Sequence, residues 1–220
     1  MPQSEPNLNP HLHSQPTPFA VSSARVTAKP SKNEQVVKPH NIQDLITLFS
    51  HTFNLMYNTQ LVIGNDEPLY LPASNECSYH QIIFAHGYFA SALHEIAHWC
   101  IAGKKRRLQE DFGYWYEPDG RDEHQQQLFE SVEVKPQAIE WAFCLAANKN
   151  FSVSVDNLNG CETNTKAFTL LVLKQVESYI NNGFPKRAQQ FINRLAEFYQ
   201  TSAPLSLVQF KCNLLNVDYS

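Results

Sequence analysis

Apolar residues recur at helical spacing in several stretches of the chain. In 42–57, side chains such as Phe49 and Phe53 fall on one face, which predicts an amphipathic helix. The same pattern predicts further helices at 86–103, 123–134, 166–183 and 184–200. Pro136 follows the third predicted helix, and it either kinks that helix or lies in the first turn of a new one over 135–149.

Short runs with strand character lie between the predicted helices. Enrichment in β-branched and aromatic residues predicts strands at 59–64, 79–85, 112–116 and the start of 151–160. The segment 65–76 contains Pro68 and Pro72, so we predict a loop there. A few short strands followed mostly by helices indicate an α+β fold, with a single, mostly helical domain and a small sheet.

The first 40 residues differ in composition from the rest of the chain. They contain seven of the 13 prolines, with Ser, Asn, Gln and Lys between them. Such a segment buries too little apolar surface to offset the entropy lost on ordering. We therefore predict a disordered N-terminal tail over 1–40, followed by one domain over 41–220.

Charge and cysteine content narrow the class of protein. The net charge is -4 and the pI is about 6.1, so no global attraction to nucleic acid or to an anionic membrane is expected. The five cysteines are odd in number and widely spaced, which is typical of a reducing compartment. The N-terminus has no basic region followed by an apolar one, and no run of 18 apolar residues occurs. We expect a soluble cytoplasmic protein with no nucleic-acid or membrane partner.

The segment 91–107, SALHEIAHWCIAGKKRR, contains the motif H-E-x-x-H. His94 and His98 are four residues apart, so a helix places both imidazoles on one face, where they can bind one metal ion. Glu95 has the position of the general base that activates metal-bound water in zinc peptidases. Gly103 is suited to end the helix. An ordinary helix that happens to carry two histidines is the alternative.

A third protein ligand is needed, and a carboxylate is the best candidate. The longer motif with a third histidine fails, since Gly103 is five residues after His98 and no histidine follows nearby. In 129–141 a polar stripe recurs at three- and four-residue steps: Glu130, Glu133, Gln137 and Glu140. We predict Glu133 as the ligand, with Glu130 next. A solvated helix face is the alternative.

Two histidines and one carboxylate are compatible with more than one chemistry. With a metal-bound water and a general base they form a zinc hydrolase, and with open positions for O₂ and substrate they form a non-haem iron oxygenase. A zinc metallopeptidase is therefore one reading of the motif. A non-enzymatic binding module with a structural metal is another.

Several long blocks resemble the elongation factor P hydroxylase family. They are HGYFASALHEIAHWCIAGKKRR (86–107), DFGYWYEPDGRD (111–122) and FESVEVKPQAIEWAFC (129–144). DEPLYLPA (66–73) and VSVDNLNG (153–160) fit the same family. The blocks occur in the right order over about 41–200, and the resemblance does not include the N-terminal tail.

The resemblance implies an activity and a site. Members add oxygen to a lysine side chain of translation elongation factor P after that lysine has received a β-lysyl group. The fold is implied to be distinct from the double-stranded β-helix of the 2-oxoglutarate oxygenases, with a zincin-like metal helix. The motif falls on His94, Glu95 and His98, and the carboxylate on Glu133. Oxidation of an unactivated C–H bond favours redox-active Fe(II) over zinc, with O₂ as co-substrate, whereas no sequence feature indicates the electron donor.

Other residues are candidates for binding the protein substrate. The run Lys104, Lys105, Arg106 and Arg107 could attract an acidic partner, or could simply compensate the negative end of the helix. Tyr114 in the aromatic run, with Asp119 and Arg121 in the following turn, could contact the substrate lysine or its surroundings. Packing and turn formation are the alternatives for these three.

Overall fold

The computed structural model describes residues 38–217, apart from 66, 111–119, 156 and 158–163. Residues 37–220 form one compact unit. The predicted tail lies outside the described residues except at its end. There, the Lys38 ammonium lies over the Phe198 ring and His40 Nε2 lies 2.8 Å from the Ala147 carbonyl oxygen.

Helices dominate the described part of the chain, and the predicted α+β class is confirmed. The elements are α1 (Ile42–Tyr57), β1 (Thr59–Ile63), β2 (Leu69–Leu71), β3 (His80–Phe84), a short 3-10 helix η1 (Ala85–Gly87), α2 (Phe89–Ile101), a second 3-10 helix η2 (Arg106–Leu108), α3 (Glu123–Ala146), α4 (Thr165–Asn182), α5 (Lys186–Tyr199) and α6 (Leu207–Val217).

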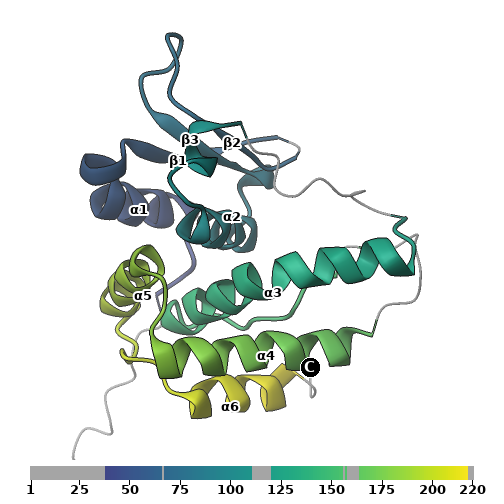
Figure 1. Ribbon diagram of the computed structural model, residues 1–220. Helices are drawn as coiled ribbons and strands as arrows, with labels where there is room; N and C mark the ends of the chain where they lie inside the picture. The colour runs from purple at the N-terminus through teal and green to yellow at the C-terminus, as the bar shows by residue number, and fades with distance from the viewer. Residues whose placement is uncertain (1–37, 66, 111–119, 156, 158–163, 218–220) are drawn as a thin grey trace, which may run out of the picture. The chain divides into compact units, whose positions relative to one another are not determined.

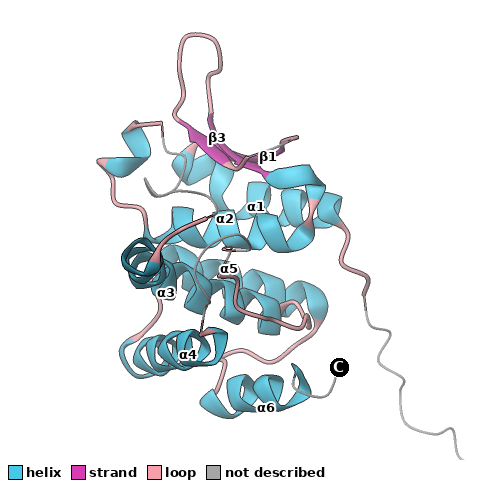
Figure 2. Cartoon of the chain, turned by 90° about the vertical axis from the view of Figure 1, so that its right-hand side faces the viewer, coloured by secondary structure: helices cyan, strands magenta, loops and turns pink. Residues whose placement is uncertain are grey.

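The three strands form one small sheet in the order β1-β3-β2. β1 and β3 are parallel, with Leu61 opposite Ile82, whereas β2 is antiparallel to β3, with Tyr70 opposite Ile82. α1 and α2 pack on this sheet, and α3, α4, α5 and α6 lie on the other side of them, as Figures 1 and 2 show. The sheet therefore supports the helix that carries the H-E-x-x-H motif.

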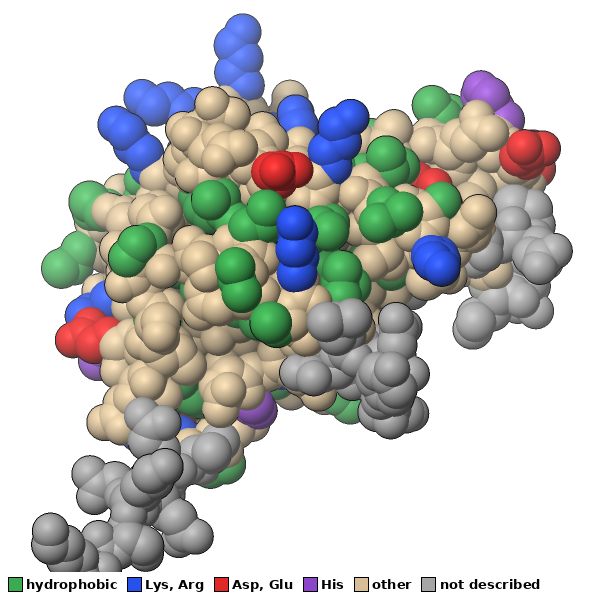
Figure 3. Space-filling model, turned by 90° about the horizontal axis from the view of Figure 1, so that it is seen from below, with side chains coloured by type: hydrophobic (Ala, Val, Ile, Leu, Met, Phe, Trp, Pro, Cys, Tyr) green, Lys and Arg blue, Asp and Glu red, His purple; other side chains and the backbone are tan. Residues whose placement is uncertain are grey.

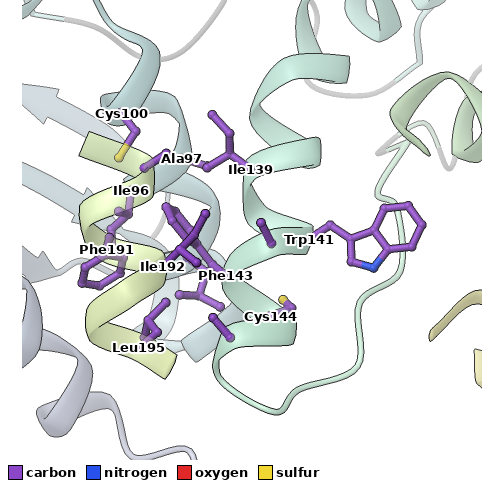
Figure 4. Packing of buried hydrophobic residues seen from close by; sticks show 14 of the residues in the cluster. Ile96, Ala97, Cys100, Ile139, Trp141, Phe143, Cys144, Phe191, Ile192 and Leu195 are labelled. Atoms are coloured by element: carbon purple, nitrogen blue, oxygen red, sulfur yellow. The ribbon is translucent and has the colours of Figure 1, made fainter. Parts of the chain in front are cut away.

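α2 lies at the centre of the fold and contacts β3, α3 and α5. Figure 4 shows where α2, α3 and α5 meet. The buried cluster there includes Ile96 of α2, Ile139 and Phe143 of α3, and Phe191 of α5. All four side chains are fully buried. Because α2 is packed on several sides, its polar residues are held in fixed directions.

α3 runs without a break through Pro136, so this residue neither ends a helix nor begins one. An N-terminal capping box begins the helix: the Asp122 side chain accepts from the Gln125 N–H, and the Gln125 side chain accepts from the Asp122 N–H. Proline inside a helix removes one backbone hydrogen bond. Pro136 is buried within the continuous helix.

Three secondary-structure predictions differ from the structure. The predicted loop 65–76 contains β2, which is only three residues long and lies at the edge of the sheet. The predicted strand at the start of 151–160 is wrong for residues 151–155. The Gln137 side chain bonds both backbone groups of Ser154, in place of a neighbouring strand. The helix α6 was not predicted at all. The run 112–116 lies outside the described residues.

Some apolar side chains of α3, α4 and α6 are exposed, among them Leu128, Leu170, Leu171 and Val208. Figure 3 shows hydrophobic side chains near the middle of the face seen from below, with lysine or arginine among them. Exposed apolar residues are common on folded proteins, so we assign no role to this face. Within the described residues, no helix has both the length and the apolar content needed to cross a bilayer.

Candidate metal centre

The packing of α2 against α3 brings two histidines and one carboxylate together. His94 and His98 lie on one face of α2, as predicted, and Glu133 projects from α3. The two Nε2 atoms are 3.0 Å apart. Glu133 Oε1 lies 3.3 Å from His98 Nε2, and Glu133 Oε2 lies 3.5 Å from His94 Nε2. All the candidate ligand atoms are within 4.8 Å of one another.

These separations fit a metal ion bound by all three side chains. Metal–nitrogen and metal–oxygen bonds of about 2.0–2.1 Å place neighbouring ligand atoms about 3.0–3.4 Å apart, depending on the coordination geometry. The two imidazole nitrogens and the carboxylate have separations close to this range. Two histidines and one carboxylate suit a transition metal and leave coordination positions for other molecules.

The state of the Glu133 carboxylate also fits a metal ligand. Its side chain is 1% exposed, and among the described residues Oε1 has no hydrogen-bond donor. Oε2 accepts a long hydrogen bond, of 3.5 Å, from Gln137. A buried carboxylate oxygen without a donor is costly, and a bound cation would satisfy it.

His94 is oriented by a second carboxylate of α3. His94 Nδ1 lies 2.8 Å from Glu140 Oε2. An ionised carboxylate can only accept a hydrogen bond, so Nδ1 carries a proton, and in the neutral imidazole that binds a metal Nε2 is the lone-pair donor on the side of His98 and Glu133. A carboxylate in this place is a common outer partner of metal-bound histidine.

Burial and charge act in opposite directions on the site's pKa values. Burial raises the pKa of Glu133, but His98 and His94 outweigh it and hold the value at about 2. Burial lowers the pKa of His94, but the hydrogen bond and charge of Glu140, with the charges of Glu133 and Glu95, raise it to about 10. The raised pKa of His94 and the lowered pKa of Glu133 both indicate that the carboxylates between α2 and α3 stabilise a positive charge there.

Glu95 lies beside this cluster and is not part of it. Burial is the main cause that raises the pKa of Glu95, and the charges of Glu133 and Glu140 add to it, whereas His94 and His98 lower it. Its side chain lines a cavity of about 280 Å³ together with His98. Glu95 is thus placed to hold a proton between the histidines and the cavity.

Glu130, the alternative ligand, is directed elsewhere in the structure. Glu130 Oε1 accepts a hydrogen bond of 3.2 Å from Gln126, and the residue is outside the group that could hold an ion. One helical turn separates it from Glu133, which is enough to move it away from the histidines.

Comparisons with known proteins agree with the geometry. The sequence profile of the elongation factor P hydroxylases matches residues 48–210. The chain belongs to the elongation factor P hydroxylase family. It is 52% identical over 171 residues to the elongation factor P lysine hydroxylase of Haemophilus influenzae. The matched residues make up 78% of this chain and 96% of that protein. The matched region includes α2 and α3, and therefore every residue of the candidate metal centre.

The basic run after α2 divides into two parts in this hydroxylase family member. Lys104 and Lys105 are exposed, whereas Arg106 and Arg107 are half-buried and line the cavity. An Arg107 N–H donates to the Ala102 carbonyl, so this residue does compensate the helix end, as one of the two readings expected.

The structure does not place Arg121 where a substrate could easily reach it. Its side chain is fully buried, and its guanidinium donates to Gln126 and to the Val155 carbonyl and lies over the Phe129 ring. Arg121 thus links the start of α3 to Val155, in the segment that follows α3, and these contacts favour a structural role. Tyr114 and Asp119, the other two candidates of this region, lie outside the described residues.

Two residues of the site were not assigned a role from sequence. Glu140 and Gln137 were recognised as members of the polar stripe, but not as the residues that orient His94 and contact Glu133. A signal for Glu140 was present, because a residue two helical turns from a proposed ligand lies on the same face of the helix.

Proposed function

We propose that this protein hydroxylates the β-lysylated lysine side chain of translation elongation factor P, with non-haem Fe(II) bound by His94, His98 and Glu133. The observation that carries the proposal is the convergence of these three side chains in a member of the elongation factor P hydroxylase family. The name of the Haemophilus influenzae relative supports the same substrate. A translation factor as substrate favours action in the cytoplasm.

The metal would supply what the side chains cannot. An unactivated C–H bond resists acid and base, and a redox-active ion at this site would allow its oxidation by O₂. One oxygen atom would enter the lysine and the other would leave as water, so two electrons and two protons must come from a reductant. Zinc would not supply this chemistry, which is why iron is proposed.

The residues around the ligands would hold the site in one geometry. Glu140 fixes the tautomer and ring direction of His94 through the 2.8 Å contact. Gln137 is itself fixed, because its amide accepts from the Ser154 N–H and donates to the Ser154 carbonyl. From that position it limits how far the Glu133 carboxylate can turn.

Glu95 would hold or release a proton during the reaction. Its raised pKa keeps a larger fraction of the carboxyl protonated near neutral pH than for an exposed glutamate. Its place on the cavity wall beside His98 puts that proton next to the ligands. The role differs from that in a peptidase, where Glu95 would activate a water molecule.

Lys104 and Lys105 would form part of the docking surface for the protein substrate. Both are exposed and directly follow the metal helix. Exposed cations raise the rate of association with an acidic partner, and salt reduces this effect because it screens the attraction. Tyr114 and Asp119 remain proposed substrate contacts on the grounds of the sequence alone.

The test is the intact mass of β-lysylated elongation factor P after aerobic incubation with the protein, ferrous iron and a series of reductants. The proposal expects a gain of one oxygen atom, lost in His94→Ala and retained in Glu130→Gln. No gain with any reductant would overturn it. Cleavage of a peptide library that is abolished by Glu95→Gln would instead establish a zinc metallopeptidase.

A further inference from the structure

The C-terminal end of α2 is bound by two arginines. Arg187, from α5, donates through Nη2 to the carbonyl oxygens of Trp99, Cys100 and Ala102, at 2.7, 3.0 and 2.6 Å. Arg107 donates to the Ala102 oxygen as well. Gly103, predicted to end the helix, has no positive φ. The guanidinium groups therefore replace a glycine cap at this end.

The two arginines bring more positive charge than a helix end needs. A helix C-terminus is equivalent to about half a negative charge, whereas each guanidinium carries a full positive one. Within the described residues, neither Arg107 nor Arg187 forms an ion pair with a carboxylate. The Arg187 Nε atom is buried and has no acceptor in the part of the chain that the structure describes. Burial, and then the charge of Arg107, lower the pKa of Arg187.

The cavity beside the metal centre opens onto this positive end. Its described lining includes the cationic side chains of Arg107 and Lys135 and one acidic side chain, that of Glu95. Arg106 also lines the cavity but has a further interaction of its own. Lys135 comes from α3 and is exposed, so it stands at the rim, whereas Arg107 is half-buried. Trp99 also lines the cavity, and no described residue accepts a hydrogen bond from its buried indole N–H.

We infer that this cavity is a binding site for a small carboxylate, held by Arg107 with Lys135 at the rim. A guanidinium with donors to spare matches the two oxygens of a carboxylate. The volume of about 280 Å³ is at the small end for ligand pockets, which suits a molecule of a few carbons. The same positive lining disfavours the doubly charged β-lysyl-lysine chain, so that chain would approach the metal from another side.

The carboxylate could come from two sources. One is a free small acid, bound beside His98 as a co-ligand of the reaction. The other is an aspartate or glutamate side chain of the docked protein substrate. The binding site itself does not depend on the proposed hydroxylation, because it can be measured without turnover.

The experiment is calorimetric titration of the full-length protein with succinate, at low salt, before and after treatment with a chelator. Arg107→Gln keeps an N–H that can bond the Ala102 carbonyl and removes the charge. We expect it to weaken binding by about tenfold or more, and Lys135→Gln to weaken it less. Lys104→Gln is the matched control, since it removes one charge from the same basic run outside the cavity. Circular dichroism would show that the variants are folded.

The outcomes distinguish a free acid, a side chain of the substrate and the absence of a carboxylate site. Succinate binding that survives the chelator and depends on Arg107 but not on Lys104 supports a free acid as the ligand. Absence of succinate binding, together with elongation factor P binding that Arg107→Gln weakens by a clearly larger factor than Lys104→Gln does, supports a side chain of the substrate. Binding that disappears with the chelator, or that both variants weaken equally, overturns the inference.

Discussion

The Nδ1 atom of His94 lies 2.8 Å from a carboxylate oxygen of Glu140, so a metal ligand on α2 is oriented by a residue of α3. Glu140→Gln would keep a side chain of the same size but remove the charge that favours the Nδ1–H tautomer. We expect metal affinity to fall by about 10- to 100-fold with little change in fold. Competition with a chromogenic chelator measures this. Glu130→Gln is the control, and equal affinities in both variants would rule out the orienting role.

The assignment of Glu133 as the third ligand predicts a simple difference in metal content. Glu133→Gln should purify with little or no bound metal, because the amide is a far weaker ligand than the buried carboxylate. Glu130→Gln should retain the full content, since Glu130 bonds Gln126 instead. Elemental analysis of the two purified variants decides between them. The reverse result would show that Glu130 is the ligand.

The metal-free protein should lose stability as pH rises above neutral. His94 has a folded-state pKa of about 10, and an unfolded histidine has one of about 6.5. A raised pKa contributes stability that is complete below the unfolded value and is lost as pH rises through the folded one. Glu133, with a pKa of about 2, contributes above about 4.3 and loses this only as pH falls toward 2.

Urea denaturation of chelator-treated protein between pH 6 and 8.5 tests this dependence. The free energy of unfolding should decrease by at most about 1.4 kcal/mol per pH unit. The His94→Ala variant should show a much smaller slope over the same interval. A free energy that stays level or rises with pH in the unmodified protein would show that His94 does not take up the extra proton.

Arg121 should matter for stability more than for substrate binding. Arg121→Met removes the hydrogen bonds to the Gln126 and Val155 oxygens, and a buried acceptor left unpaired, as for Gln126, costs about 1–3 kcal/mol. Urea denaturation measures the loss. Arg194→Met is the matched control, because Arg194 pairs with Glu197 at the surface and such pairs contribute about 0–1 kcal/mol. A stable Arg121→Met protein with a raised KM would restore the substrate contact.

Helix periodicity was the most reliable guide to the fold. Every stretch with a clear 3.6-residue pattern is helical, and the two short strands rich in Ile and Val occur as β1 and β3. Two of the differences from the structure, at β2 and at residues 151–155, share a cause. β2 depends on a partner strand rather than on its own sequence, and residues 151–155 are held by the Gln137 side chain, which no local pattern reveals. Tertiary contacts decide such segments.

In the metal centre, too, local sequence predicts some features and tertiary contacts decide the others. The spacing of His94 and His98 fixes their common face, so their approach within 3.0 Å was predictable in outline. The choice between Glu130 and Glu133 depended on how α3 is rotated against α2, and that is set by buried residues of both helices. The role of Arg187 at the end of α2 was out of reach, because it comes from a helix far along the chain.

A metal ion between α2 and α3 would also act as a cross-link. His98 and Glu133 belong to helices joined by a long connection, and a bond through the ion would close that stretch into a loop. Closing a loop reduces the entropy of the unfolded chain, much as a disulfide does, and binding to the folded state alone adds further stabilisation. Loading of the site should then be visible as resistance to heat, even in a preparation that has no substrate to modify.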